Sequence, residues 1–322
     1  MKALVYDEDL KLVKDYPNPV LGENEVLIKT IMAGICNTDY EITQGYMGYK
    51  GVIGHEFVGR VVDVGCKVDK NLINKRVVGE INCACEECDM CHKNLRRHCP
   101  NRSTLGIYKK NGCFSEYFTL PWQNVIEISS NVDDITATFT EPLAAAMEIL
   151  EQVHIKPDSK VAILGDGKLG LCISLVFSAM NINYIHIGKH KEKLQITKDL
   201  GNKVMMLDEI SEKDKKSFDV VIEATGSTGG FNTSASLVKP RGILVLKSTI
   251  AAKEGLNLAG IVVDEITIIG SRCGQFKPVL EILEKQKINV KPLVSAVYNV
   301  DDFEEAFKKN SQKDVIKVLV KF

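Results

Sequence analysis

The spacing of apolar residues changes near residue 140 of this 322-residue chain. Before that point, short runs alternate between apolar and polar positions, as in residues 25–31 and 56–64. A period of two is typical of strands that have one buried face. Glycines recur through residues 34–65 and predict turns between the runs. The first part of the chain is therefore expected to form a compact, β-barrel-like domain.

From about residue 142 the pattern alternates strands with helices. The expected elements are strands at 161–164, 184–187, 220–224, 243–246 and 266–269, with helices starting at 169 and spanning 192–200. Strands that alternate with helices predict a parallel, doubly wound sheet. Helices over 278–286 and 303–309 and a strand over 315–321 complete the chain. The expected fold class is α/β.

The length of the chain predicts the number of domains, and its net charge excludes some kinds of partner. A chain of 322 residues exceeds what one hydrophobic core usually supports, so two domains are expected. The longest strongly apolar run, 169–180, is too short to span a bilayer, and the amino terminus lacks a secretory signal pattern. We therefore expect a cytoplasmic protein without a membrane partner. A formal net charge of −1 provides no broad basic face for nucleic acid.

Four of the ten cysteines form a compact group in residues 83–100. Cys85, Cys88, Cys91 and Cys99 have the spacing C-x2-C-x2-C-x7-C. This spacing lets one short loop arrange four sulfurs tetrahedrally around a zinc ion, with no open position, as in a structural site. Unligated buried thiols are the simpler alternative, but packing alone rarely places four cysteines so close. A zinc ribbon that contacts nucleic acid would need the basic face that the chain lacks.

A second set of potential metal ligands is dispersed along the chain. Cys36, His55, Glu56 and Glu141 supply a thiolate, an imidazole and two carboxylates from separate segments. Three protein ligands, with one position left for water or substrate, describe a catalytic zinc. Each signal is weak alone, because a single Cys or His is more often a core residue. Glu141 could simply open a helix beside Pro142.

A glycine-rich turn follows the predicted strand at 161–164. Residues 165–170 read G-D-G-K-L-G and match G-x-G-x-x-G between a strand and a helix. In that context, backbone amides at the start of the helix hold a pyrophosphate. The residues expected to contact the cofactor there are Gly165, Gly167, Lys168, Leu169 and Gly170.

The end of the next strand bears on the choice of nucleotide. An acid normally stands there and binds the ribose 2′-hydroxyl, but this chain continues with Gly188, Lys189 and His190. A missing carboxylate removes repulsion, and nearby cations could pair with a 2′-phosphate. The sequence therefore favours NADP over NAD, unless these are ordinary solvated charges ahead of a helix.

These motifs follow one another in a single order along nearly the whole chain. They are Cys36 with Thr38, Gly-His-Glu at 54–56, the four-cysteine lobe, Thr-Glu-Pro-Leu at 140–143 and the glycine fingerprint. Together they resemble the zinc-containing medium-chain alcohol dehydrogenase family, and look closer to its sorbitol, threonine and glucose dehydrogenase branch than to the ethanol enzymes. The resemblance implies hydride transfer between NAD(P) and a small alcohol, polyol or sugar, with one catalytic and one structural zinc.

The resemblance also implies a domain plan and an assembly. A GroES-like catalytic domain would comprise residues 1–141 and 272–322, and a Rossmann domain would comprise residues 142–271. Relatives in this family are dimers or tetramers that often pair through an edge strand, here residues 265–270. A homodimer or homotetramer is therefore expected.

Roles for single residues follow from the same resemblance. The residues around the catalytic zinc would be Cys36, His55, Glu56 and Glu141. Glu56 and Glu141 would either bind the ion or hold its water. Thr38 would take the alcohol proton, and Asp39 would steady the site. Relatives often carry a histidine three residues beyond that threonine, whereas this chain has Glu41, so the exit route for the proton stays open.

Three further residues receive roles from the resemblance at some distance from the zinc. Glu116 stands where sugar-active relatives contact the substrate. Thr225 and Arg272 match segments that line the nicotinamide and the pyrophosphate. Apolar strand residues near them are more simply explained as core.

Two other functions fit part of these signals. A zinc-free quinone or enoyl reductase shares the fold but normally lacks both metal sites. A non-catalytic protein that binds zinc and a nucleotide would have no need of a proton relay such as Thr38.

Overall fold

The computed structural model describes residues 1–249 and 258–322. The chain divides into two compact units. The first unit comprises Met1–Glu141, Phe276–Gln286 and Leu293–Phe322, and the second comprises Pro142–Gln275 and Lys287–Pro292. The carboxyl-terminal segment thus returns to the unit that the amino-terminal residues build.

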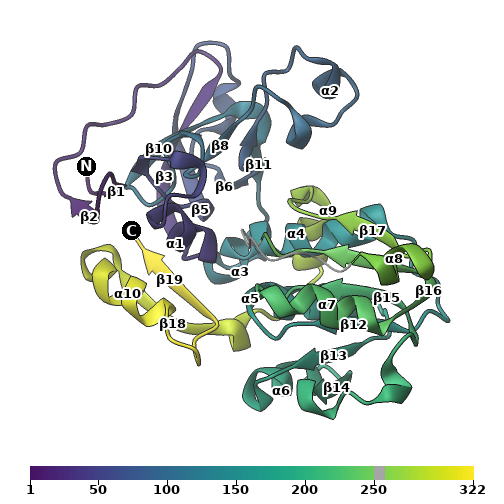
Figure 1. Ribbon diagram of the computed structural model, residues 1–322. Helices are drawn as coiled ribbons and strands as arrows, with labels where there is room; N and C mark the ends of the chain where they lie inside the picture. Colours follow the sequence, from purple (N-terminus) through teal and green to yellow (C-terminus); the bar gives the residue numbers. More distant parts are fainter. Residues whose placement is uncertain (250–257) are drawn as a thin grey trace. The chain divides into compact units, whose positions relative to one another are not determined.

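A sheet centred on β3 (Glu25–Gly34) forms the core of the first unit (Figure 1). β3 pairs antiparallel with β5 (Glu56–Val64), and its last residues pair antiparallel with β19 (Lys317–Lys321). The other strands of this sheet are β6 (Arg76–Gly79), β10 (Tyr117–Pro121), β11 (Val125–Glu127) and β18 (Val294–Asn299). Residues from both ends of the chain therefore meet at the carboxyl end of β3.

Burial along β3 follows the alternation that predicted a strand. Val26, Ile28 and Thr30 are buried and Lys29 is exposed. From Met32 onward burial is continuous, because this end lies in the interior next to α3 (Asp134–Thr138). Within the described residues, the pairings of this sheet run from β11 to β18 without joining these two strands. They show an α/β protein with a β-rich unit and do not show closure into a barrel.

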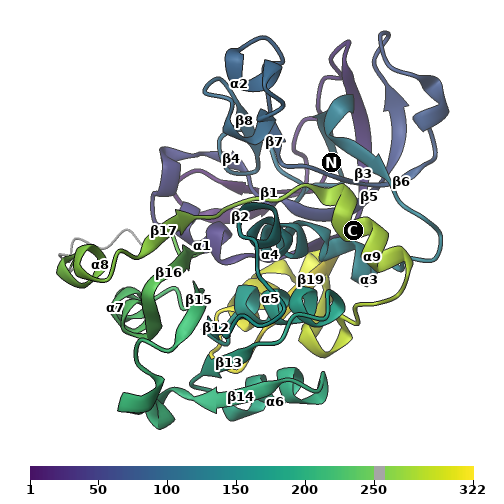
Figure 2. The ribbon, with the colours of Figure 1, turned by 90° about the vertical axis from the view of Figure 1, so that its right-hand side faces the viewer.

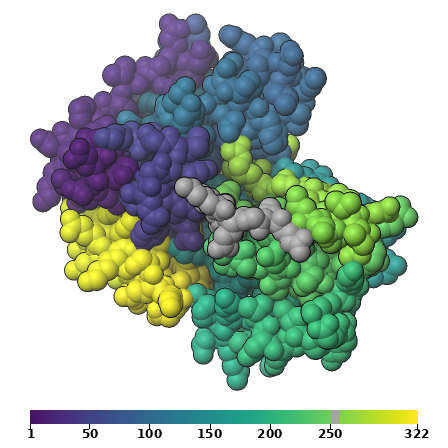
Figure 3. Space-filling view, viewed as in Figure 1, coloured from purple at the N-terminus to yellow at the C-terminus, as the bar shows by residue number. Residues whose placement is uncertain are grey.

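Short elements complete the first unit. Two small sheets contain β1 (Ala3–Tyr6), β2 (Leu10–Val13) and β4 (Gly51–Val52), and β7 (Asn82–Cys83), β8 (Ser103–Leu105) and β9 (Lys109–Lys110). The other helices are α1 (Asn37–Thr43), α2 (Asp89–His92), α9 (Phe276–Glu284) and α10 (Phe303–Asn310). In the space-filling view, the carboxyl-terminal residues, in yellow, lie against amino-terminal residues in purple (Figure 3).

The second unit is built on a parallel sheet of six strands in the order β14-β13-β12-β15-β16-β17 (Figure 2). The strands are β12 (Val161–Leu164), β13 (Ile185–Gly188), β14 (Lys203–Met206), β15 (Phe218–Glu223), β16 (Val238–Leu246) and β17 (Thr267–Gly270). The helices are α4 (Thr140–Gln152), which begins in the first unit, α5 (Lys168–Ala179), α6 (Lys191–Asp199), α7 (Thr228–Leu237) and α8 (Ala259–Val263). All four residues of β12 are buried, as expected for a central parallel strand.

The sequence pattern located β3, β5 and β19 in the first unit and five of the six strands of the parallel sheet. The other strands of the first unit were expected only as a β-rich pattern, without bounds. β14 and β18 each lie at an edge of their sheet, and neither was predicted. β14 has an exposed lysine followed by three half-buried residues, so it carries no clear apolar period. The charged stretch at 209–216 contains short 3-10 turns.

Candidate functional site

Cys36 lies at the junction between β3 and α1. It has extended backbone angles (φ −103°, ψ 160°) and caps the amino end of the helix. The carboxylate of Asp39, in the first turn, accepts the backbone N–H of Cys36 through Oδ2 at 2.8 Å. This reciprocal cap fixes the direction of the helix start. The strand end and the cap together hold the thiol in place.

His55 and Glu56 stand where β5 begins, beside the end of β3. Glu56 pairs directly with Gly34 across the two strands. The sheet therefore brings the second pair of predicted ligands next to Cys36. The ligand atoms of Cys36, His55 and Glu56 all lie within 4.8 Å of one another. His55 and Glu56 are buried, whereas Cys36 is half-buried.

Asp39 also faces the imidazole of His55. Its Oδ1 atom lies 3.4 Å from His55 Nδ1, and neither atom has a hydrogen-bond partner of good geometry. Burial lowers the pKa of His55, but the Asp39 carboxylate and the Cys36 sulfur outweigh it, so the pKa is raised well above its ordinary value. A carboxylate behind one ring nitrogen orients a metal-binding histidine so that the other nitrogen faces the ion.

This donor set fits a zinc ion. A tetrahedral zinc with bonds of about 2.0–2.3 Å separates its ligand atoms by about 3.3–3.8 Å. The observed cluster supplies a sulfur, a nitrogen and an oxygen within that reach after small adjustments. His55 Nδ1 and Asp39 Oδ1 are poorly paired, and a metal ion bound at the other ring nitrogen would shorten the contact between them. Three such ligands leave a fourth position for substrate or water.

Thr38 and Glu41 follow on the same helix. The Thr38 hydroxyl lies 3.7 Å from the Cys36 sulfur, so it stands beside the cluster as predicted for a proton acceptor. Glu41 is half-buried, and this burial raises the pKa of its carboxyl group. A carboxyl group with a raised pKa exchanges protons nearer to neutral pH.

Two predicted residues stand outside the cluster. Glu141 is half-buried and does not belong to the ligand group of Cys36, His55 and Glu56. The carboxylate of Glu116 accepts the backbone N–H of Lys2 at 2.7 Å, which ties β1 to the segment before β10. The zinc role of Glu141 and the substrate role of Glu116 stay predictions.

Lys317 is a functional candidate that the sequence did not reveal. Its ammonium group forms a buried ion pair with Glu56 Oε2 and lies 3.4 Å from the Ile35 carbonyl oxygen. Both side chains are almost fully buried, at 3% and 1% exposure. Glu56 can therefore offer its other oxygen to a metal while Lys317 balances its charge. The pair forms because the last strand, far from Glu56 in the sequence, lies beside it in the fold. No local sequence motif therefore predicts the pair.

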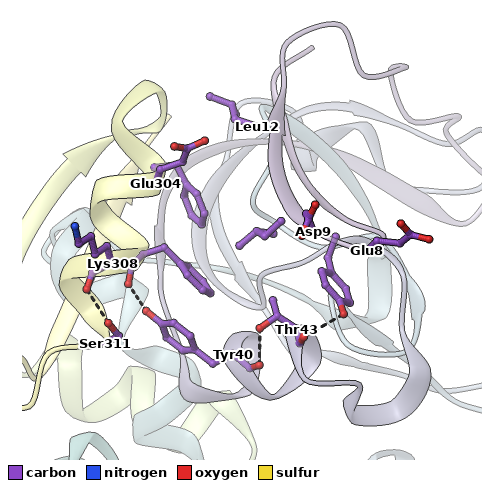
Figure 4. Close-up of a pocket in the computed structure, with 12 residues that line it drawn as sticks. Glu8, Asp9, Leu12, Tyr40, Thr43, Glu304, Lys308 and Ser311 are labelled. Atoms are coloured by element: carbon purple, nitrogen blue, oxygen red, sulfur yellow. Dashed lines mark hydrogen bonds between the residues drawn. The ribbon is translucent and has the colours of Figure 1, made fainter.

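The outer face of α1 is anchored by Tyr40. Its hydroxyl donates to the Phe307 carbonyl in α10, and the two rings lie 4.0 Å apart (Figure 4). Burial raises the pKa of Tyr40 to about 12, so the phenol stays protonated and keeps donating. A surface groove of about 460 Å³ runs along this contact, with Glu8, Asp9 and Glu304 on its rim. None of the three zinc-site ligands lines this groove.

The four cysteines of the lobe converge in the structure. Sulfur–sulfur distances are 3.5 Å for Cys85–Cys99 and Cys88–Cys91, and 3.8 Å for Cys88–Cys99. Zinc–sulfur bonds of about 2.3 Å in a tetrahedron require edges of about 3.8 Å. Backbone N–H groups, led by that of Glu87, lower the pKa of Cys85 to about 6 and so favour a thiolate. The lobe therefore fits a structural zinc with four protein ligands.

An ion pair braces the lobe. Arg96 forms a two-pronged ion pair with Glu86, at 2.9 Å from Nε and 2.6 Å from a terminal nitrogen. This pair joins both sides of the lobe.

The glycine turn adopts the form that the fingerprint predicts. Gly165 has φ 118°, and a Cβ there would approach the Ala224 carbonyl oxygen to 2.4 Å. A Cβ on Gly170 would meet the Gly165 carbonyl oxygen at 1.8 Å. Only glycine at both positions lets α5 start directly above β12. The pyrophosphate role of residues 165–170 stays a prediction.

His186 holds the glycine turn in place through hydrogen bonds. The imidazole is fully buried; its Nε2 donates to the Gly165 carbonyl at 2.9 Å, and its Nδ1 accepts the Thr197 hydroxyl at 2.7 Å. Burial lowers the pKa of His186, with minor opposition from Gly165 and Asp166. The neutral ring is thus the form that the fold holds.

The burial of His186 predicts that the second unit loses stability at acid pH. Because the folded pKa lies below the unfolded value of about 6.5, the unfolded chain takes up the proton first as pH falls. Stability from this group is present above about pH 6.5 and declines below it, by at most about 1.4 kcal/mol per pH unit. Urea unfolding between pH 5 and 7.5 should show a shallower decline in His186→Gln than in the wild type. An exposed-histidine control, His154→Gln, should follow the wild type; equal slopes in all three would contradict the prediction.

The remaining cofactor residues lie at strand ends in the same unit. The Thr225 hydroxyl donates to the buried Glu223 carboxylate at 2.6 Å, so the turn after β15 is fixed by an acid that the sequence did not single out. Arg272 is exposed, and its carbonyl oxygen accepts the buried Lys247 ammonium at 2.8 Å. Lys189 is exposed and His190 is half-buried. Their roles toward a cofactor stay predictions.

Two family models together match most of the chain. A model described as the alcohol dehydrogenase GroES-like domain matches residues 22–130, and one described as the glucose dehydrogenase C-terminus matches residues 136–322. Among the residues that the structure describes, no helix is both long and apolar enough to cross a membrane.

Curated relatives align over nearly their whole lengths. D-arabinitol dehydrogenase 1 of Uromyces fabae is 29% identical over 100% of this chain and 97% of its own length. Sorbitol dehydrogenase of Halalkalibacterium halodurans is 27% identical over 99% of each chain.

Solved structures share the fold. An alcohol dehydrogenase from Escherichia coli CFT073, complexed with NADH, has a TM-score of 0.91 and 26% identity, covering 100% of this chain and 99% of that one. A zinc-binding dehydrogenase from Sinorhizobium meliloti 1021, bound to NADP, has a TM-score of 0.89 and 24% identity, with the same coverage. One neighbour holds NADH and the other NADP, so these two structures do not choose between the nucleotides.

Proposed function

The chain belongs to the zinc-type medium-chain alcohol dehydrogenase family, and we propose that it transfers a hydride between NAD(P) and a small alcohol, polyol or sugar. The observation that carries this proposal is the cluster of half-buried Cys36 with buried His55, with Asp39 behind the imidazole. A thiolate and an imidazole held by an orienting carboxylate leave a position for substrate beside the Thr38 hydroxyl. A purely structural zinc site needs no such open position, so this arrangement favours catalysis.

Four side chains would hold and orient the catalytic zinc. Cys36 Sγ and the outer nitrogen of His55 are the ligands, and Glu56 offers a carboxylate oxygen. Asp39 fixes the imidazole from behind and the thiol through the backbone of Cys36. A bound zinc supplies Lewis-acid activation of the alcohol oxygen, and a bound nicotinamide supplies the hydride acceptor.

Thr38 is the group that takes the proton. Its hydroxyl stands 3.7 Å from the Cys36 sulfur and can accept a proton from an alcohol while passing its own outward. Glu41 lies one turn further along α1, with a carboxyl pKa raised by burial. We propose Glu41 as the next acceptor in place of the histidine that relatives carry. The alcohol loses a hydride and a proton and becomes a carbonyl compound.

The proposed substrate class and assembly rest on different observations. Arabinitol and sorbitol dehydrogenases among the relatives favour a polyol or a related sugar. For assembly, β17 lies at the edge of the parallel sheet, and Ile268 in this strand and Val262 and Val263 of α8 are exposed. A second copy that pairs along β17 would cover these residues, so we propose a homodimer or a homotetramer of such dimers.

Metal analysis combined with a substrate screen tests the proposed function. We expect two zinc ions per chain, binding of a nicotinamide nucleotide, and reduction of that nucleotide by at least one polyol, sugar or simple alcohol. Cys88→Ser should lose the lobe ion and keep the other, because the two ligand groups share no residue. A protein that carries both ions and binds the nucleotide, but oxidises no member of a broad panel, would be a binding protein instead.

A further inference from the structure

A buried carboxylate stands at the end of the second strand of the parallel sheet, although the sequence places none there. It belongs to Asp166, the second residue of the glycine turn after β12. Asp166 Oδ2 accepts the backbone N–H groups of Lys189 at 2.7 Å and His190 at 2.5 Å, and His190 Nδ1 lies 3.1 Å from both carboxylate oxygens. The side chain is only 10% exposed. The turn after β12 thus supplies the acid that the end of β13 lacks.

Gly188 is the counterpart of this arrangement. A Cβ at Gly188 would come within 2.5 Å of Asp166 Oδ2 and 2.6 Å of the Asp166 Cβ. A side chain at the end of β13 and a carboxylate at position 166 therefore exclude each other. In the usual pattern the strand end bears the acid, whereas here glycine stands at the strand end and the acid stands at a variable position of the glycine turn.

The NADP prediction had assumed that no carboxylate stands at this strand end, and that assumption is wrong. We propose that Asp166 is the residue that selects the nucleotide, by accepting the ribose 2′-hydroxyl and repelling a 2′-phosphate, so that the protein binds NAD in preference to NADP. The inference deepens the proposed function and rests on it.

The bonds of Asp166 leave room for a hydroxyl donor. A carboxylate offers about four acceptor positions, and three donors from Lys189 and His190 occupy this one. An additional O–H donor can be accepted at Oδ1. Burial raises the pKa of Asp166, but the His190 and Lys189 bonds outweigh this and lower it overall, so the group is charged at neutral pH.

The same hydrogen bonds occupy the backbone donors that a 2′-phosphate would need. Backbone N–H groups at a strand end are natural phosphate donors, but those of Lys189 and His190 already point at Asp166. A 2′-phosphate would place more negative charge beside a carboxylate that is mostly buried, where like charges repel more strongly than they do in water. Lys189 and Lys191 are exposed, so solvent screens their attraction for such a phosphate.

Binding measurements without substrate test this assignment. The dissociation constants of NAD and NADP would be measured by calorimetry on the zinc-loaded wild type and on Asp166→Asn, which keeps the shape and removes the charge. We expect the wild type to bind NAD at least tenfold more tightly than NADP. The ratio of the two constants should fall at least tenfold in Asp166→Asn. Asp219→Asn removes a carboxylate at the amino end of β15, far along the chain from the turn, and should leave the ratio within twofold.

The second variant moves the acid from the glycine turn to the end of β13. Gly188→Asp combined with Asp166→Gly clears the predicted Cβ clash and should restore the preference for NAD. Preference of the wild type for NADP would overturn the inference and leave the proposed function standing. An unchanged ratio in Asp166→Asn, with both nucleotides weakened equally, would reduce Asp166 to a structural cap and also overturn it. Binding of neither nucleotide by the wild type would reject the proposed function together with the inference.

Discussion

Replacing Cys36 with serine is expected to lower kcat for alcohol oxidation by about three orders of magnitude, or about 4 kcal/mol of transition-state stabilisation. Cys36 is the one sulfur in its cluster, and a neutral serine hydroxyl is a poor zinc ligand beside a thiolate. The helix cap should survive, because the bond from the backbone N–H of residue 36 to Asp39 remains and serine is itself a favourable N-cap residue. The loss should therefore appear in rate and in metal content rather than in folding.

Cys66→Ser is the matched control for this variant. Cys66 is exposed and belongs to neither ligand group. Its serine variant should keep both zinc ions and the wild-type rate. If Cys36→Ser retained two zinc ions and wild-type turnover, Cys36 would not be a ligand of the catalytic ion, and the assignment of this cluster would fail.

The parts of the molecule that the sequence predicted well are those that local pattern determines. The four-cysteine lobe is closed by residues only fourteen positions apart, so spacing alone implied its tetrahedron. The glycine turn likewise needs only a strand before it and a helix after it. In both cases the physical constraint and the motif occupy the same short segment.

Predictions for single residues were incomplete where the constraint is non-local. The end of β13 was judged by its own sequence, Gly188 to His190, and the acid that faces it lies 22 residues earlier, at position 166. Edge strands such as β14 escaped because partial burial blurs their apolar period.

Glu56 shows the same limit at the candidate active site. Its place beside Cys36 and His55 could be expected from the resemblance, but its cation could not. Lys317 arrives from the last strand, 261 positions away, through pairing of β19 with β3. A lysine in an apolar strand near the end of a chain carries no signal for a partner in β5.

Lys317→Met is therefore expected to destabilise the first unit strongly. The substitution leaves Glu56, 1% exposed, as a buried charge without its cation. Removing one partner of a buried ion pair costs about 3–5 kcal/mol, which corresponds to a fall of about 10 °C in Tm for a unit of this size. Because bound zinc supplies positive charge near Glu56, the fall should be larger after chelation of the metal. Scanning calorimetry with and without a chelator measures both values.

A double variant separates the lost charge balance from lost packing. In Glu56→Gln with Lys317→Met, neither charge of the buried pair remains, and methionine preserves most of the apolar stem of the lysine. Replacement of a buried ion pair by neutral groups of similar volume is often close to neutral in stability. The double variant should therefore regain most of the Tm that Lys317→Met loses. A double variant as unstable as the single one would mean that Lys317 stabilises the unit by packing on Phe139 and by its bond to the Ile35 carbonyl. The pairing of charges would then not be what holds Glu56 beside the zinc ligands.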